Sequence, residues 1–156
     1  MSQPVTESLR WSELLDRLRN VPQRIRDLVA GKAYEELHCG PGDGGWSACE
    51  VVAHLCAVES PYRARLVRIV LEDRPSVAAI HVETGGYDAA TPLGIMADTF
   101  AELRGGTTAF LEALPPAARG RMAQHAEKGT VTLREQVEAL VVHDQEHLAQ
   151  IAALLN

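Results

Sequence analysis

Residues 132–155, TLREQVEALVVHDQEHLAQIAALL, decide the fold of this chain. Their apolar side chains recur every three or four residues, which is the spacing of one face of a helix. Thr132 followed by Glu135 forms a T-x-x-E capping box, a signal that a helix begins here. The segment therefore predicts one long amphipathic helix. Its apolar face consists of Leu133, Val137, Leu140, Val141, Leu148, Ile151 and Leu154.

Three earlier segments show the same spacing and predict three more helices. They cover residues 12–30, 47–71 and 91–114. Ser47 and Glu50 form a second capping box at the start of the middle segment. The chain thus offers four helices of similar length, each with one apolar face that must be covered by another helix.

The connections between these helices differ in length. A glycine-rich loop, CGPGDGG, occupies residues 39–45, and a long connection spans residues 72–92. No segment alternates convincingly enough to predict a sheet, although residues 78–82 and 129–133 are candidates for short extended pieces. We therefore predict an all-α four-helix bundle with long connections after the second and third helices.

Size and charge restrict the classes of function. The 156 residues predict a single domain over residues 1–156. The net charge of −6 argues against nucleic acid as the main partner, because binding phosphates requires a basic surface. We interpret the basic run Arg63, Arg65, Arg68 and Arg74 as a solvated helix face.

Cysteine usage and the absence of targeting signals indicate the compartment. The three cysteines, Cys39, Cys49 and Cys56, are too few and too unevenly spaced for a disulfide framework, so reduced thiols are expected. The first 11 residues show no signal peptide, and no apolar run approaches the roughly 20 residues that a membrane span needs. We expect a soluble cytoplasmic protein without membrane partners.

Three histidines form the candidate functional site. His143 and His147 are four residues apart, so their side chains project from one helix face and can reach one cation. His54 lies between Val51 and Val58 on an apolar face and should also point inward. Burying three imidazoles without partners would cost several kcal/mol, whereas a shared cation satisfies all three. The alternative is that they are structural histidines that bind nothing.

The remaining polar residues near these positions support weaker hypotheses. His38, His81 and His125 are expected at the surface. The run HDQEH also matches H-x-x-E-H, an inverted zinc-protease pattern with Glu146 as general base. That pattern needs a ligand well downstream, and only nine residues follow His147, so we do not favour it. Asp144 and Glu146 are expected to face solvent.

Helical phase also suggests residues that orient the histidine rings. Gln136 and Gln150 lie seven residues before and after His143, and Glu50 lies one turn before His54. We predict these three as candidate partners of the metal ligands.

Two motifs resemble those of a known family. WSACEVVAHL at residues 46–55 resembles the W-S-x-x-E-[ILV]-x-x-H-L signature of the DinB-like (DinB/YfiT-type) proteins. TLREQVEALVVHDQEHLAQI at residues 132–151 resembles the signature near the C-terminus of that family. The order of the two motifs and their separation strengthen the resemblance. It implies a four-helix bundle in which His54, His143 and His147 bind a divalent metal ion, and often a homodimer.

The resemblance also implies possible chemistry. Family members with known activity are mostly thiol-dependent transferases or isomerases, or amide hydrolases. Three neutral imidazoles leave a divalent ion with an open position, which suits a thiol cosubstrate or a water molecule. Zn, Ni, Fe or Cu would accept three nitrogen donors. We therefore predict a metal-dependent enzyme that acts on a small molecule and activates either a low-molecular-weight thiol or water. The alternatives are a non-catalytic metal-binding bundle, for example a stress-related dimer or small-ligand binder, and a purely structural bundle.

Overall fold

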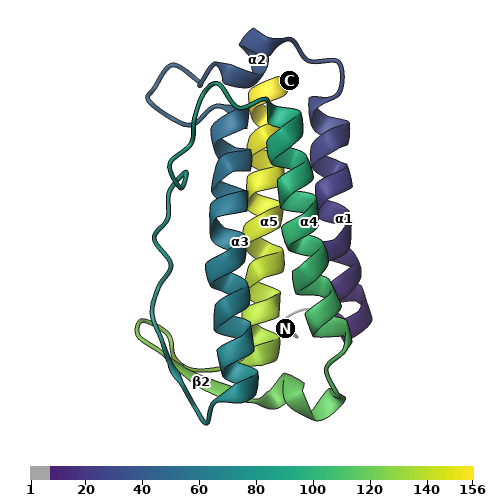
Figure 1. Ribbon diagram of the computed structural model, residues 1–156, viewed down its shortest axis with the longest axis vertical. Coiled ribbons are helices and arrows are strands. Elements are labelled where there is room, and N and C mark those ends of the chain that lie inside the picture. The colour runs from purple at the N-terminus through teal and green to yellow at the C-terminus, as the bar shows by residue number, and fades with distance from the viewer. Residues whose placement is uncertain (1–7) are drawn as a thin grey trace, which may run out of the picture.

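The computed structural model describes residues 8–156, and within this range four long helices form a bundle (Figure 1). The long helices are α1 (Trp11–Val29), α3 (Ala48–Leu71), α4 (Leu93–Glu112) and α5 (Leu133–Leu155). These bounds differ from the predicted ones by at most two residues. The predicted all-α bundle is therefore confirmed, while the prediction about a signal peptide falls largely on residues 1–7, outside the described residues.

The predicted capping boxes begin the two helices that carry the candidate site. The Ser47 hydroxyl accepts a hydrogen bond from the backbone N–H of Glu50, and the Glu50 carboxylate accepts one from the backbone N–H of Ser47. Thr132 and Glu135 exchange the same pair of bonds at the start of α5. These contacts satisfy backbone N–H groups that a helix start leaves unpaired, so they fix where each helix begins.

The helices follow an unusual order in space. Each long helix packs against two others, in the cyclic order α1, α4, α3, α5. In Figure 1, α1 and α5 run in one direction, while α3 and α4 run in the other. Because α3 and α4 are parallel neighbours, the connection over residues 72–92 must return along the whole length of the bundle. The predicted long connection therefore passes beside α3, the helix that carries His54.

A small sheet at one end of the bundle was not predicted. It contains β1 (Ser76–Val77), which pairs in parallel with β2 (Met122–His125), and β3 (Gly129–Thr132), which pairs antiparallel with β2. The expected extended piece at residues 129–133 corresponds to β3, whereas residues 78–82 form no strand. Strands of two to four residues are too short to show an alternating pattern, which explains the error.

Two short helices complete the described elements: α2 (Tyr34–His38) before the glycine-rich loop, and a 3₁₀ helix, η1 (Pro116–Gly120), after α4. The apolar core forms two clusters, one in each half of the bundle. Both are mainly aliphatic, and aromatic residues make up only 4% of the chain.

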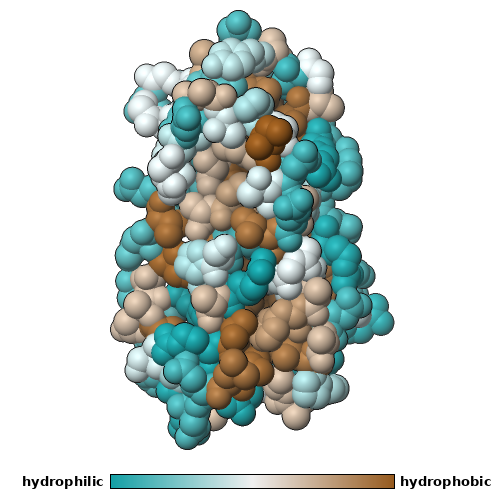
Figure 2. Space-filling view, in the orientation of Figure 1, coloured by the Kyte–Doolittle hydropathy of each residue, from teal (hydrophilic) through white to brown (hydrophobic). Residues whose placement is uncertain are grey.

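Hydrophobic and hydrophilic residues are mixed on one face of the molecule. Hydrophobic residues appear in separate patches among hydrophilic ones on the face drawn in Figure 2. Among residues 8–156, no helix is both long enough and apolar enough to cross a membrane.

Candidate metal centre

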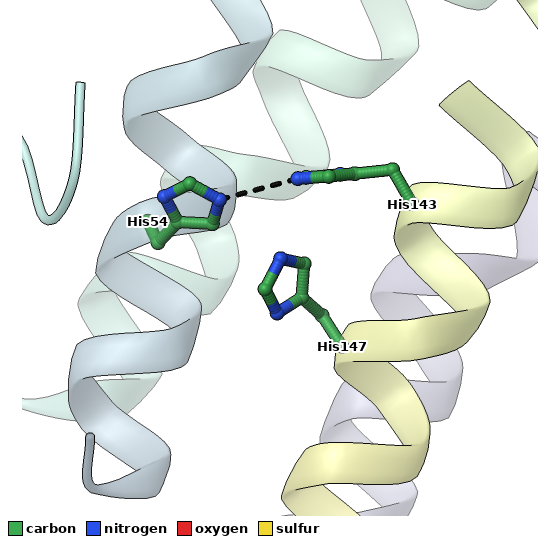
Figure 3. Close-up of side chains that lie close together, drawn as sticks. All are labelled: His54, His143 and His147. Carbon is green, nitrogen blue, oxygen red and sulfur yellow. Dashed lines mark hydrogen bonds between the residues drawn. The ribbon is translucent and has the colours of Figure 1, made fainter. Parts of the chain in front are cut away.

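Three imidazoles from two neighbouring helices converge on one point. His54 comes from α3, and His143 and His147 come from successive turns of α5; their rings point toward one another (Figure 3). One ring nitrogen of each histidine lies within 4.8 Å of those of the other two. The Nε2 atoms of His54 and His143 are 3.2 Å apart. The structure thus brings together the three residues predicted from spacing.

The hydrogen bonds of two of these rings fix their tautomers. The Nδ1–H of His54 donates to the backbone carbonyl of Glu83 at 2.5 Å. The Nδ1–H of His147 donates to Oε1 of Gln150 at 2.8 Å. Because a carbonyl oxygen can only accept, the proton of each neutral ring is on Nδ1, and Nε2 carries a free lone pair.

The protonation of these rings suits metal binding. Burial lowers the pKa of His54, although the bond to Glu83 acts in the opposite direction, and His143 nearby lowers it further. Burial likewise lowers the pKa of His147, with the bond to Gln150 opposing it and the neighbouring histidines adding to it. Both rings are therefore neutral at pH 7, which is the form that binds a metal.

The geometry of the nitrogens fits a divalent transition-metal ion. Two nitrogens bound to one tetrahedral ion at 2.0–2.1 Å lie roughly 3.3 Å apart, close to the 3.2 Å between His54 and His143. Nε2 of His54 carries a lone pair, so this contact requires either the Nε2–H of His143, which gives the hydrogen bond drawn in Figure 3, or a cation between the two nitrogens. The donor set therefore fits an ion held by three neutral nitrogens, with an open position for a further ligand.

The third ring has a different environment. Nδ1 of His143 is buried and has no hydrogen-bond partner among the described residues. The nearest acidic oxygen is Oδ1 of Asp144, at 3.9 Å. This carboxylate is too distant for a hydrogen bond. If Nε2 of His143 binds a metal ion, the ring proton must be on Nδ1, and the carboxylate is close enough to attract that Nδ1–H electrostatically.

Asp144 belongs to a buried ionic cluster, which corrects the prediction that it faces solvent. Arg104 of α4 forms two bonds to Glu59 of α3, at 2.8 and 2.9 Å, and two to Asp144 of α5, at 2.7 and 3.1 Å. The side chains of all three residues are at most 2% exposed. Helical phase places Asp144 on the apolar face of α5, four residues after Leu140 and four before Leu148, so the error came from its charge. The partner that allows this charge to be buried, Arg104, lies on another helix. Glu146 is exposed, as predicted, which also argues against its role as a buried general base.

The residues predicted to orient the rings have different positions. Gln150 contacts His147 directly. Gln136 does not contact a histidine; its Oε1 accepts a hydrogen bond from Arg65. Seven residues separate it from His143, which is about 10.5 Å along the helix and too far for contact. The Glu50 carboxylate likewise serves the helix cap and no imidazole. For Gln136 and Glu50 the predicted ring-orienting role is therefore wrong.

Two residues that we did not predict as part of the site lie against it. Trp46 packs over the rings of His54 and His147, with centroid separations of 4.9 and 6.5 Å, and shields them on that side. The backbone of Glu83, in the long connection, accepts the bond from His54. A backbone carbonyl leaves no signal in the sequence, so Glu83 was not predictable.

A cavity of about 250 Å³ opens beside His54 and His143. Its wall includes Arg65 and His125, both nearly buried at 8% and 5% exposure. The predictions of a solvated Arg65 and a surface His125 are therefore wrong, because the sheet and the long connection cover both side chains. His38 is half-buried between Tyr34 and Cys49, also against prediction, whereas His81 is exposed as expected.

A larger cavity of about 620 Å³ lies away from the histidines. It is bounded by the end of α1, by α2 and by the start of α4, with Arg26, Tyr34 and Asp98 in its wall. It contains none of the three converging rings, so the smaller cavity is the one that serves the candidate metal centre.

Several known proteins are similar to this chain. The model of the DinB superfamily matches residues 17–151. A Bacillus subtilis protein named "Putative metal-dependent hydrolase YfiT" is 27% identical over 150 residues, covering 93% of this chain and 82% of that protein. The Oceanobacillus iheyensis protein "Putative metal-dependent hydrolase OB0782" is 23% identical over 145 residues, covering 92% of this chain and 84% of that protein.

A solved structure supports the fold. The structure of YfiT from Bacillus subtilis is described as that of "a probable metal-dependent hydrolase with an unusual four-helix bundle topology". It superposes with a TM-score of 0.82 at 25% sequence identity, covering 98% of this chain and 91% of that chain.

Proposed function

The chain belongs to the DinB superfamily, and we propose that it is a divalent-metal-dependent hydrolase in which His54, His143 and His147 bind the ion. The observation that carries the proposal is the convergence of three ring nitrogens within 4.8 Å, two of them held as lone-pair donors by bonds to Glu83 and Gln150. The names of the relatives support a hydrolase.

The protein residues around the site have separate tasks in this proposal. A bound divalent ion would lower the pKa of a water molecule or thiol at its open position and polarise a carbonyl. The three imidazoles hold the ion without neutralising its charge, because each is neutral. Trp46 excludes solvent on one side, and the cavity beside His54 and His143 admits the substrate from the other.

A thiol cosubstrate is the second candidate for the open position. A thiolate is a better nucleophile than water and binds transition metals well. The same three-nitrogen site would support an S-transferase or isomerase reaction, as the resemblance to thiol-dependent family members suggests. We also propose that the protein acts as a homodimer, which sedimentation velocity tests directly.

Turnover assays distinguish these candidates. Metal-loaded protein is assayed with a panel of amides and esters, and with low-molecular-weight thiols paired with electrophiles. We expect hydrolysis that disappears in His54→Ala and persists in His81→Ala, a control that removes an exposed histidine of the long connection. Thiol-dependent turnover alone would replace the hydrolase with the second candidate. Retained metal without any turnover would favour a non-catalytic metal-binding protein.

A further inference from the structure

The cavity of about 250 Å³ beside the candidate metal centre is lined by basic side chains as well as by two of the metal-site histidines. His54 and His143 form one side, and Arg65, His125 and Lys128 lie on the wall as well. These residues come from α3, from α5, and from β2 with the turn that follows it. This wall depends on the tertiary fold, because the small sheet positions His125 and Lys128 beside α3.

Arg65 is a nearly buried cation without an acidic partner. It is 8% exposed; its Nη1 donates to Oε1 of Gln136 at 3.0 Å, and its Nη2 donates to the carbonyl of Ala78. No carboxylate among residues 8–156 lies within salt-bridge distance of it. Arg104, which is 1% exposed, has two carboxylate partners. A buried charge left with neutral partners is costly, so an anion in the cavity would stabilise Arg65.

His125 adds a neutral hydrogen-bond donor of fixed orientation. Its Nδ1 accepts hydrogen bonds from the backbone N–H groups of Glu127, at 3.1 Å, and Lys128, at 3.3 Å. The proton of the neutral ring must therefore be on Nε2. No group among the described residues forms a hydrogen bond with this Nε2–H. A ligand in the cavity is then the natural acceptor.

The charges around His125 select the type of anion. Burial lowers the pKa of His125, and the positive charges of Arg65 and Lys128 lower it further, while Glu127 has a smaller opposing effect. The ring therefore stays neutral at pH 7, and both cations lie close enough to act on it. Glu127 also lines the cavity, so the three charged side chains sum to one positive charge. At this wall the side chains therefore balance the single charge of a carboxylate, and the charge of an ion at the histidines is left for the reacting group that binds there.

We propose that this cavity binds a carboxylate group of the substrate, with Arg65 and His125 as the residues that recognise it. The inference rests on the proposed function, because it places the reacting end of the same molecule at the metal centre. A volume of about 250 Å³ suits a small acid or the acidic end of a larger molecule. The substrate class is therefore a molecule with a free carboxylate group.

Paired thiol probes test this assignment in the metal-loaded protein. Cobalt(II)-loaded protein is titrated with 3-mercaptopropionate and with 3-mercapto-1-propanol, and thiolate binding is followed by the charge-transfer absorption of the metal. The two probes differ only in the carboxylate. A charge-assisted contact predicts that the acid binds at least about tenfold more tightly. Equal affinities for the two probes would contradict the proposal.

Two variants assign the preference to a residue. Arg65→Met should reduce the preference for the acid to less than about twofold. Arg68→Met is the matched control, because Arg68 lies one turn further along α3, is exposed and already pairs with Glu72 at 2.6 Å. It should retain the wild-type preference. If folded Arg65→Met protein still binds the acid more tightly than the alcohol, to the same degree as the wild type, Arg65 does not recognise the carboxylate.

A second measurement needs neither the variants nor the metal. Chelator-treated wild-type protein is titrated with propionate and with propionamide, and the ring resonances of His125 are followed by NMR. We expect propionate alone to shift them. If cobalt does not bind, the proposed metal-dependent function is contradicted. The NMR titration still shows whether the cavity binds a carboxylate. A His125 signal that responds to neither ligand, or equally to both, would overturn the inference.

Discussion

The buried cluster of Arg104, Glu59 and Asp144 leads to a prediction about metal affinity. Arg104 contacts both carboxylates with two bonds each, but only Asp144 lies beside the candidate metal centre, with Oδ1 at 3.9 Å from Nδ1 of His143. The cluster carries one net negative charge. We predict that this charge strengthens metal binding through His143, because a carboxylate near the outer N–H of a ligating imidazole makes the ring a better donor.

The substitutions Asp144→Asn and Glu59→Gln separate this effect from stability. Each removes one negative charge and leaves Arg104 with one carboxylate, so both should lower the free energy of unfolding by a similar amount, about 1–3 kcal/mol. This is less than the 3–5 kcal/mol expected when a buried charge loses its only partner. Urea unfolding of the metal-free proteins measures these values.

Metal affinity should differ between the two variants. Asp144→Asn should weaken metal binding about 10- to 100-fold, equivalent to about 1.4–2.8 kcal/mol. Glu59→Gln should change it by less than about threefold, because Glu59 contacts Arg104 and no histidine. Competition with a chromophoric chelator gives both dissociation constants. Equal losses of affinity in the two variants would refute the electrostatic argument and indicate a general effect of destabilisation.

Three further predictions concern the helix cap, the ring orientation and the effect of pH. Ser47→Ala should lower the unfolding free energy by about 1 kcal/mol, because the backbone N–H of Glu50 loses its acceptor; an unchanged urea midpoint would contradict this. Gln150→Leu should weaken metal binding about tenfold, since His147 loses the acceptor of its Nδ1–H, and an unchanged dissociation constant would show that packing alone orients the ring. In metal-free protein the pKa values of His54 and His147 are lowered, whereas in the unfolded chain an imidazole has a pKa near 6.5. Below about that pH the unfolded chain therefore binds more protons than the folded protein. The unfolding free energy should therefore fall as the pH decreases from about 7.5 toward 5.5. If urea titrations showed an unfolding free energy that increases as the pH is lowered, the lowered pKa values would be contradicted.

The helices and the three histidines were predictable because local patterns determine them. Apolar spacing and capping boxes at Ser47 and Thr132 act over a few residues, so they are visible in the sequence. The i, i+4 spacing of His143 and His147 fixes their common face in any helix. His54 was predictable because its apolar neighbours require it to face inward.

The remaining features depend on contacts between distant segments. Arg65 appeared to belong to a solvated basic face, and only the sheet and the long connection bury it. Asp144 looked exposed because its partner, Arg104, comes from a different helix. His125 gains its role from a strand of four residues, which is too short to recognise by pattern. Sequence periodicity reports which face of an element is apolar, but it does not report which buried polar groups meet.

Metal analysis of untagged protein tests the central claim most directly. After growth with supplemented transition metals, the wild-type protein and the His81→Ala control should each carry about one ion per chain. His54→Ala, His143→Ala and His147→Ala should each lose most of it while remaining folded by circular dichroism. Metal content that is negligible in the wild type, or unchanged in all three variants, would contradict the claim that these imidazoles form a metal centre.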